Sequence, residues 1–313
     1  EVIYTAAVDR LRFSAVPPDG YRWNATTQKP EIQLSVVTSS GTVSLNGGAA
    51  SQRVEGWFEA GSTLTITLTP AAGASLKRWD GGTVVEGGEA GTYTCVVAAP
   101  VTLMAVCGNE SKTWVGASGA RWDDEASWDP EGIPAAGDVV TIPKGKTVVI
   151  AESTAKVGVL DVLGIVSNAT WDAALNASVV MVMNGGEITC GGAFDDEANA
   201  TRVNIVCDDL TVEKGGRIHA DKRGWQGGNT THKSGYGPGA IPGDSYFAGG
   251  GHGGIGSYRV VNNDAPRVAL ATNEYGSASA PITAGSGGWG GNGRGGHGGG
   301  VVTIAASGRV TVY

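Results

Sequence analysis

The stretch Gly285-Ser-Gly-Gly-Trp-Gly-Gly-Asn-Gly-Arg-Gly-Gly-His-Gly-Gly-Gly300 closes a region, residues 215–300, that holds more than half of the chain's 52 glycines. Such a density is typical of a flexible linker. Two features favour a packed structure instead. The glycines recur as Gly-Gly-X, which on an extended helix with three residues per turn leaves a bare glycine edge for neighbouring backbone. Aromatic side chains, which disordered linkers seldom carry, interrupt the glycines.

The glycine-rich region runs directly into two short β-branched runs, Val301-Val-Thr-Ile304 and Arg309-Val-Thr-Val-Tyr313, around a Ser-Gly turn. These runs predict strands. We therefore expect the glycine-rich segments, at about residues 224–257 and 276–300, to be excursions that pack against a β scaffold.

Composition limits the classes of function. The chain has 313 residues, of which 41% are hydrophobic and 17% charged, which fits a folded protein of two or three domains. A net charge of -8 without any run of Lys and Arg argues against a nucleic-acid partner. No stretch approaches the roughly 20 apolar residues of a membrane span. The chain begins at Glu1 without Met, so we expect a processed secreted chain or an excised piece.

The four cysteines fall into two close pairs, Cys95 with Cys107 and Cys190 with Cys207, without the Cys-x-x-Cys spacing of zinc sites. The first pair flanks an expected hairpin, and the second is about one coil apart in the scaffold predicted below. We predict two disulfides; buried free thiols are the alternative.

Asn-x-Ser/Thr triplets occur more often than chance would give. They are candidate glycosylation sites of a secreted protein in a host with that machinery, and they begin at Asn24, Asn109, Asn168, Asn176, Asn199 and Asn229.

Residues 1–108 read as short β-branched or alternating runs between Gly, Pro, Asn and Asp turns. The expected strands are 2–8, 11–16, 32–37, 42–45, 64–69, 93–97 and 101–106. Two parts, 13–23 and 65–79, share a strand, a turn with Pro and Gly, and an Arg-Trp end, as in tandem modules. We predict a partial or degenerate β repeat module at 1–40 and a complete one at 41–108.

The second module resembles the bacterial extracellular repeat domain related to the internalin B-repeat. The likeness lies in Gly61-Ser-Thr-Leu-Thr-Ile-Thr-Leu-Thr-Pro70, Lys77-Arg-Trp-Asp-Gly-Gly82 and the run from Tyr93 to Val106. The resemblance implies a small β-grasp-like spacer of surface proteins without catalytic residues.

From Val139 to Ala220, apolar runs of three to six residues alternate with Gly, Asn or Asp corners. The expected strands are 139–142, 147–150, 157–162, 178–183, 187–190, 202–207, 210–212 and 217–220. Short uncharged runs suit parallel strands whose inner side chains stack from coil to coil. No helical stretch of an open α/β sheet is visible. We predict an all-β fold whose residues 109–313 form a right-handed parallel β-helix; a β-sandwich is the alternative.

The segment from Thr113 to Pro143 resembles the opening of pectin-lyase-like, autotransporter-type and adhesin β-helices. Trp114-Val-Gly, Trp122, and Trp128 followed by Gly-Ile-Pro134 and Gly-Asp138 carry the likeness, although Ser127 stands where the family commonly has Asn. We expect the three tryptophans to cover the open end of the core. The glycine-rich region is itself similar to insertions of secreted β-helix proteins that have no established chemistry.

Candidate sites are weak. A phosphate cradle of glycines needs a following helix, and Val301–Ile304 reads as strand. His252 and His297 sit in matching Gly-Gly-His-Gly-Gly frames, which suit a metal pair less well than two histidines bonded to carbonyls. The acidic clusters fall at predicted corners, where carboxylates are ordinarily solvated; corner calcium stays an alternative. These clusters are Asp195-Asp-Glu197, Asp208-Asp209 and Asp221-Lys-Arg223.

Two functions follow. The first is a non-enzymatic, extracellular structural or adhesive protein of a cell-surface assembly. Its partners would be copies of itself or other surface proteins, joined head-to-tail into filaments through open strand edges at Val2–Val8 and Arg309–Tyr313. The second is a polysaccharide-binding or polysaccharide-processing protein, in which aromatic residues stack on sugar rings. The candidate sugar contacts are Trp225, Tyr236, Tyr246 and Trp289. We expect no cofactor, no resident metal and no catalytic residues.

Overall fold

The computed structural model describes residues 17–240, 249–252, 275–277, 279, 282–290, 293 and 295–313. The chain divides into two compact units, Glu1–Glu110 and Ser111–Tyr313. Both are built from β-strands, and the only helical turns among the described residues are two short 3-10 segments, η1 (Glu125–Ser127) and η2 (Glu197–Asn199). No helix in this part of the chain is long and apolar enough to cross a membrane. The expected strands 2–8 and 11–16 lie outside the described residues.

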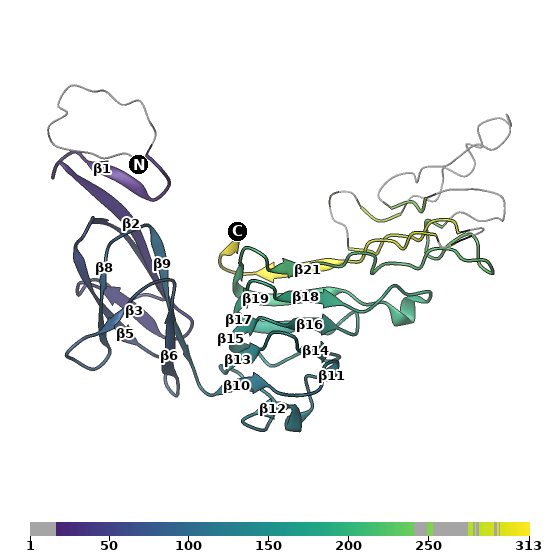
Figure 1. Ribbon diagram of the computed structural model, residues 1–313, viewed down its shortest axis with the longest axis horizontal. Coiled ribbons are helices and arrows are strands. Elements are labelled where there is room, and N and C mark those ends of the chain that lie inside the picture. The colour runs from purple at the N-terminus through teal and green to yellow at the C-terminus, as the bar shows by residue number, and fades with distance from the viewer. Residues whose placement is uncertain are drawn as a thin grey trace. The chain divides into compact units, whose positions relative to one another are not determined.

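The first unit packs two sheets against each other (Figure 1). One sheet has the order β1-β2-β9-β6 with β4 paired to β2, and the other has the order β3-β5-β8-β7. In β5, Leu64, Ile66 and Leu68 are buried between threonines, so the period of two predicted by the sequence gives the sheet one core face. The strands are β1 (Tyr21–Asn24), β2 (Lys29–Thr38), β3 (Thr42–Leu45), β4 (Arg53–Glu59), β5 (Thr63–Thr69), β6 (Ser75–Asp80), β7 (Val85–Glu86), β8 (Thr92–Val96) and β9 (Val101–Gly108).

The predicted boundary after residue 40 has no counterpart in the structure. Strand β2 lies inside its sheet, antiparallel to β4 and parallel to β9, and its Leu34 and Val36 are fully buried in the shared core. Residues 29–38 therefore belong to the same unit as residues 41–108. The other predicted boundary, between 108 and 109, lies within two residues of the division between the units.

The second unit consists of two sheets in which nearly all strands run parallel (Figure 1). The first sheet has the order β12-β10-β13-β15-β17-β19-β21, with β22 paired to β19, and the second has the order β11-β14-β16-β18-β20. From β13 to β21, successive strands alternate between the two sheets. We call one strand of the first sheet with the following strand of the second a coil. The strands are β10 (Ser111–Trp114), β11 (Ala120–Arg121), β12 (Trp128–Asp129), β13 (Val139–Ile142), β14 (Thr147–Ile150), β15 (Val157–Val162), β16 (Ile165–Asn168), β17 (Leu175–Val182), β18 (Glu187–Cys190), β19 (Val203–Val212), β20 (Arg217–Ile218), β21 (Val302–Ala306) and β22 (Val310–Val312).

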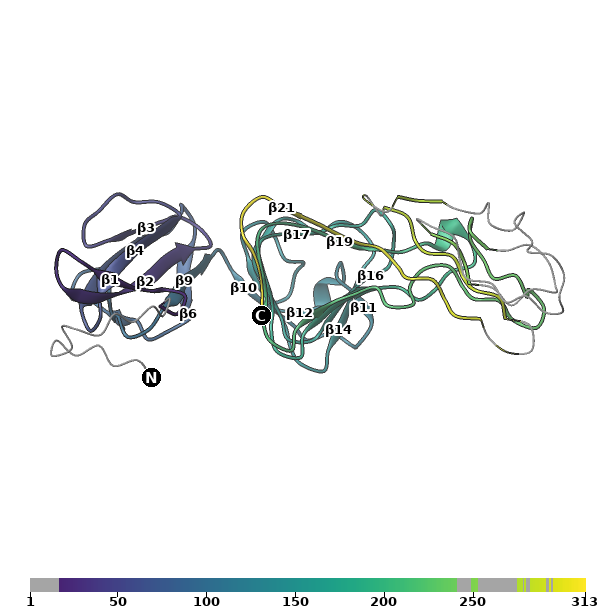
Figure 2. The same ribbon diagram turned by 90° about the horizontal axis from the view of Figure 1, so that it is seen from above.

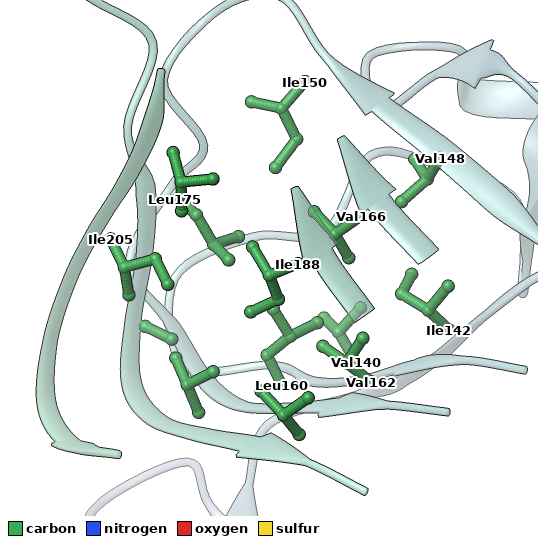
Figure 3. Packing of buried hydrophobic residues seen from close by; sticks show 14 of the residues in the cluster. Val140, Ile142, Val148, Ile150, Leu160, Val162, Val166, Leu175, Ile188 and Ile205 are labelled. Atoms are coloured by element: carbon green, nitrogen blue, oxygen red, sulfur yellow. The ribbon is translucent and has the colours of Figure 1, made fainter. Parts of the chain in front are cut away.

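The parallel register places similar side chains above one another from coil to coil. The view from above in Figure 2 shows that the strands themselves overlie one another. One column runs Val140, Leu160, Val180, Leu210, and a facing column runs Val148, Val166, Ile188, Ile218. The members of both columns that Figure 3 labels point into one core between the two sheets. Val180, Leu210 and Ile218 belong to the same core cluster or pack against it. Each fully buried Val, Leu or Ile contributes roughly 1.5–3 kcal/mol, so the stack supplies much of the stability of the unit.

Three tryptophans lie at the β10 end of this core. Trp114, Trp122 and Trp128 are buried, their rings meet edge to face at 4.9 and 4.8 Å, and the indole Nε1–H of Trp128 donates to the carbonyl of Trp122 at 2.8 Å. Strand β12 runs antiparallel to β10 and covers its outer edge. The tryptophans therefore close the core, and β12 occupies the strand edge at which the stack would otherwise continue.

The glycine-rich segments 224–228, 285–290 and 295–300 are joined by main-chain hydrogen bonds. The amide of Gly224 donates to Gly298 at 2.9 Å, that of Gly298 to Trp225 at 2.9 Å, that of Trp225 to Gly285 at 3.0 Å, and that of Gly285 to Gly299 at 2.9 Å. In both ribbon views these segments run side by side beyond the last strands of the second sheet (Figures 1 and 2). We call them the glycine layer.

Close approach of backbones explains why the layer requires glycine. A Cβ added at Gly298 or Gly287 would lie far inside 3.0 Å of a neighbouring carbonyl oxygen, that of Gly285 or Gln226. Other members of the layer, among them Gly227, Gly290 and Gly295, are equally enclosed by backbone. A residue with any side chain would have to push two main chains apart and break their hydrogen bonds.

The two predicted disulfides are wrong: all four cysteines are free and buried. Cys95 and Cys107 do not flank a hairpin, because β8 pairs with β5 and β7 whereas β9 belongs to the opposite sheet. Cys190 on β18 and Cys207 on β19 likewise belong to different sheets, where their cross-strand neighbours are Asn168 and Ala177. Each thiol is therefore a small apolar member of a core.

Two of the six candidate glycosylation sites are also contradicted by the structure. Asn168 is 0% exposed, with its Nδ2 donating to the carbonyl of Ala173 at 2.9 Å. The Nδ2 of Asn176 donates to the carbonyls of Thr154 and Ala174 at 2.8 and 3.1 Å. An amide nitrogen engaged in this way inside the fold is closed to a glycan. The remaining sites, of which Asn109 and Asn199 are exposed and Asn24 and Asn229 are half-buried, stay predictions.

Gly298→Ala tests the close approach in the glycine layer. We expect the second unit to lose about 2–3 kcal/mol of unfolding free energy, because the new Cβ overlaps the carbonyl of Gly285. Gly299→Ala is the matched control: nothing lies within 4 Å of a Cβ there. Guanidinium unfolding should leave that control within about 0.5 kcal/mol of the parent chain. Equal stability of the two variants would contradict the backbone packing.

Cys207 predicts a pH dependence of stability. Burial, reinforced by the negative charges of Asp208 and Asp209, raises the pKa of its thiol from 9.0 to about 11. Below pH 9 the thiol is neutral in the folded and in the unfolded chain, and the contribution of the buried thiol to the free energy of unfolding is fully present. As the pH rises from 9 to about 11, only the unfolded chain ionises, so stability falls by up to about 2 kcal/mol. The difference in unfolding free energy between the parent and Cys207→Ala should shrink accordingly. A pH-independent difference, as a disulfide would give, contradicts the free thiol.

Candidate functional site

A groove of about 690 Å³ lies beside the second sheet of the second unit, within the size range of ligand pockets. Its walls come from the turns after β16, β18 and β20 and from segments of the glycine-rich region. Four aromatic residues line it: Trp171, Phe194, Trp225 and Tyr275. We call it the aromatic groove.

Successive coils place three of these aromatic residues at the same corner. Phe194 and Trp225 form an isolated parallel bridge, and the ring centroids of these two residues are 4.7 Å apart. Next to the bridge, the amide of Gln226 donates to the carbonyl of Phe194 at 2.8 Å. Phe194 is buried, and Trp171 and Trp225 pack against it while staying partly exposed. The regular climb of the chain thus produces an aromatic surface along the groove.

Tyr275 closes the opposite side through hydrogen bonds. Its hydroxyl donates to the carbonyl of Ala284 and accepts from the hydroxyl of Ser286 at 2.9 Å, and Ser286 accepts in turn from the amide of Gly239 at 2.8 Å. Burial raises the pKa of the Tyr275 hydroxyl, so it stays protonated at neutral pH. The ring meets His252 edge to face at 5.0 Å. Tyr275 is therefore fixed in position.

Polar groups at the rim are exposed. Asp172, Glu197 and Asn199 line the groove, the last two on η2, where the side chain of Asp196 accepts from the amide of Ala198 at 2.9 Å. Within the described part of the chain, the carboxylates of Asp172 and Glu197 form no hydrogen bond or ion pair. They are free to receive donors from a ligand.

One cation lies behind the aromatic surface. The guanidinium of Arg202 lies 5.1 Å from the ring centre of Trp171, and its Nε–H donates to the carbonyl of the same residue at 2.7 Å. Arg202 does not line the groove. It holds Trp171 by a cation–π contact, and none of the lining residues within the described ranges is Lys or Arg.

The predicted sugar contacts do not gather in one place. Trp225 lies in the aromatic groove, whereas Tyr236 stacks on His232 with centroids 4.1 Å apart and does not line it. Trp289 is half-buried and is not among the lining residues. Tyr246 lies outside the described residues. Sequence reasoning missed Trp171, Phe194 and Tyr275; the recurrence of an aromatic residue soon after a short strand was the available signal for the first two.

The two glycine-flanked histidines have separate backbone partners. His297 Nδ1 accepts from the amide of Gly227 at 3.0 Å, and His252 Nε2 lies 2.8 Å from the carbonyl oxygen of Thr283. His252 thus has the carbonyl partner that the sequence predicts, whereas the partner of His297 is an amide N–H instead of a carbonyl. Across the described ranges, no three His, Cys, Asp or Glu side chains cluster as metal ligands would.

The acidic clusters have different environments. Asp208 lies within β19, where Lys156 Nζ at 2.8 Å and the Ser307 hydroxyl at 3.0 Å bond its carboxylate. Burial alone would raise its pKa, but these bonds hold the pKa below its usual value. Asp221 pairs with Arg217 at 3.2 Å. Of the three clusters, only Asp195-Asp-Glu197 contributes to the aromatic groove, through Glu197.

Together the lining groups suit a ligand with both apolar faces and hydroxyl or amino groups. Aromatic faces stack on the C–H faces of sugar rings, and the carboxylates and the Asn199 amide are acceptors and donors for polar substituents. The arrangement can bind such a ligand.

Comparison with known proteins gives one match. A family model described as the G8 domain matches residues 127–221, which extend from the end of η1 through β20 and stop just before the glycine layer. No curated protein and no solved structure is significantly similar to the chain. The match covers the coils that carry Trp171 and Phe194, and does not extend to the first unit or the glycine layer.

Proposed function

We propose that the chain is a non-enzymatic, extracellular structural or adhesive protein of a cell-surface assembly. In this proposal the second unit is a right-handed parallel β-helix that presents a rigid surface, and the first unit is a spacer of the bacterial extracellular repeat type. The observation that carries it is the unbroken stacking of main chains: parallel strands bond coil to coil, and the glycine layer continues the same main-chain bonding beyond the last strands.

Rigidity supports a mechanical rather than a catalytic role. Long stacks of parallel coils bury their backbone donors and acceptors in continuous ladders, so local opening of the chain is costly. Outside the aromatic groove, some described carboxylates are held by ion pairs, as Asp208 is, and others are exposed at turns, as Asp195 is. Low surface charge and free, fully buried thiols suit a durable protein that does not depend on the redox state outside the cell.

Self-assembly through strand edges is part of the proposal. In the described residues, β21 and β22 pair on one side only, with β19, and Val302, Val310 and Val312 are exposed. Such an edge recruits another strand. At the other end of the stack, β12 covers the outer edge of β10. A partner chain would therefore pair with the β21–β22 edge through a strand other than its own β10. The other predicted edge, Val2–Val8, lies outside the described residues.

The second candidate function is polysaccharide binding, and the aromatic groove favours it. Four aromatic side chains with three polar groups at the rim form the kind of surface on which a sugar chain can stack. Adhesion to a glycan would combine the two candidates in one molecule.

Protease treatment of intact cells that make the protein tests the proposed location and rigidity. We expect trypsin added outside to release the second unit as a resistant fragment, because its backbone is held in ladders. Cells that carry Gly298→Ala should yield less of this fragment, and Gly299→Ala serves as the control. Full protection of the chain in intact cells, or complete digestion of the second unit, would contradict the proposal.

Sedimentation velocity tests assembly through the β21–β22 edge. We expect the purified chain to associate as its concentration rises and Val312→Lys to remove this association, since a charge on the edge opposes strand addition. Val206→Lys, at another exposed β-strand position, is the control and should associate as the parent does. Monomers at every concentration, or equal association of both variants, would exclude this edge.

A further inference from the structure

The charge of the aromatic groove carries an inference about its ligand, which rests on the second candidate function above. We propose that the groove selects sugar chains that bear protonated amino groups and rejects sugar chains that bear carboxylates. The acidic side chains Asp172 and Glu197 are the specificity-determining residues, and the aromatic faces of Trp171 and Trp225 hold the sugar rings irrespective of charge.

The balance of charge in the lining supports this selection. Among the lining residues that the structure describes, two are carboxylates and none is Lys or Arg. Arg202, the nearby cation, is engaged by the ring and carbonyl of Trp171 behind the wall. The net charge of the chain, -8, adds to the same field. A uronic acid would meet repulsion from both carboxylates, whereas an ammonium group would meet two acceptors.

The two carboxylates are available to bind a ligand because they are exposed and unpaired within the described ranges. Asp172 and Glu197 are exposed, and in the described ranges neither has an intramolecular donor to give up when a ligand arrives. Two other acidic residues of the second unit are engaged by cations: Asp208 by Lys156, and Asp221 by Arg217. A charge-assisted hydrogen bond from an ammonium to a free carboxylate is stronger than one between neutral groups.

The positions of the aromatic residues and the carboxylates suit them to different tasks, stacking on sugar rings and recognition of charge. The aromatic residues arise from successive coils and extend along the stack, which suits consecutive rings of an extended chain better than a single sugar. Asp172 follows Trp171 directly, and Glu197 is three residues from Phe194. Each carboxylate thus accompanies an aromatic residue, so that stacking and charge recognition act on the same or adjacent sugar rings.

Isothermal titration with three soluble oligosaccharides of matched length tests the proposal. The probes are a glucosamine hexamer, an N-acetylglucosamine hexamer and a galacturonic acid hexamer, titrated at low salt and pH 6. We expect the glucosamine hexamer to bind about tenfold more tightly than its acetylated counterpart, and the galacturonic acid hexamer not to bind. Raised salt should reduce the preference because it screens exposed charges.

Variants locate the effect in the groove. The double change Asp172→Asn with Glu197→Gln should bring the glucosamine and N-acetylglucosamine hexamers to equal affinity without loss of the neutral one. Asp195→Asn is the matched control: this exposed carboxylate belongs to the same acidic cluster but does not line the groove, and the preference should persist. Circular dichroism would verify that each variant keeps the parent fold.

The outcomes separate the inference from the function on which it rests. If both neutral and amino hexamers bind equally to the parent, or if the double variant keeps the preference, the charge selection is wrong while carbohydrate binding stands. Tight binding of the galacturonic acid hexamer also overturns it. If none of the three binds, both the selection and the polysaccharide-binding candidate fall.

Discussion

The hydrogen bond between one layer of main chain and the next is the interaction on which this structure depends. In the second unit it links parallel strands, as between β15 and β17, and in the glycine layer it links extended segments without strand character, as between Gly224 and Gly298. Both require main chains to lie close together over their whole length. In the strands the side chains point to either face of the sheet and permit this approach. In the glycine layer, glycines such as Gly287 and Gly298 lie at the closest contacts, where a side chain would overlap the neighbouring backbone.

This one constraint also positions the candidate site. Because each coil repeats the path of the previous one, residues at equivalent corners lie above one another, and Phe194 and Trp225 meet through a parallel bridge. The corner between β17 and β18, at the other end of β18, is narrow as well: a Cβ at Gly186 would overlap the carbonyl of Val162 from the preceding coil. The aromatic groove is therefore a consequence of coil stacking combined with the choice of aromatic residues just beyond the strands, and the glycine-rich segments supply its remaining wall through Tyr275.

Much of the strand content could be predicted from local pattern, and the exceptions have physical causes. The predicted runs 139–142, 147–150, 157–162 and 187–190 coincide with β13, β14, β15 and β18. Strand β16 was missed because Ser167 and Asn168 read as a turn; it is held by pairing with β14 and β18, and Asn168 takes a place in the column between Ile150 and Cys190. Asp208 and Asp209 read as a corner, but Lys156 and Ser307 stabilise Asp208 inside the single strand β19.

Long-range relations were harder to predict. Cysteines close in sequence lie on opposite sheets, since β8 and β9 part instead of forming a hairpin, and a sequence pattern does not specify which sheet a strand joins. The groove depends on Trp171, Phe194 and Tyr275, which lie in irregular turns far apart in the chain. By contrast, the expectation that bare glycine edges face neighbouring backbone needed only the Gly-Gly-X spacing, and Gly287 and Gly298 are enclosed in that way.

Amide hydrogen exchange measured residue by residue is the most direct test of main-chain bonding in the glycine layer. The amides of Gly224, Trp225, Gly285 and Gly298 donate to neighbouring segments, so they should exchange as slowly as amides in β15 and β17. Exchange of these four amides at the rate of an unstructured chain, while the strands remain protected, would show that the layer is not packed and would contradict the account.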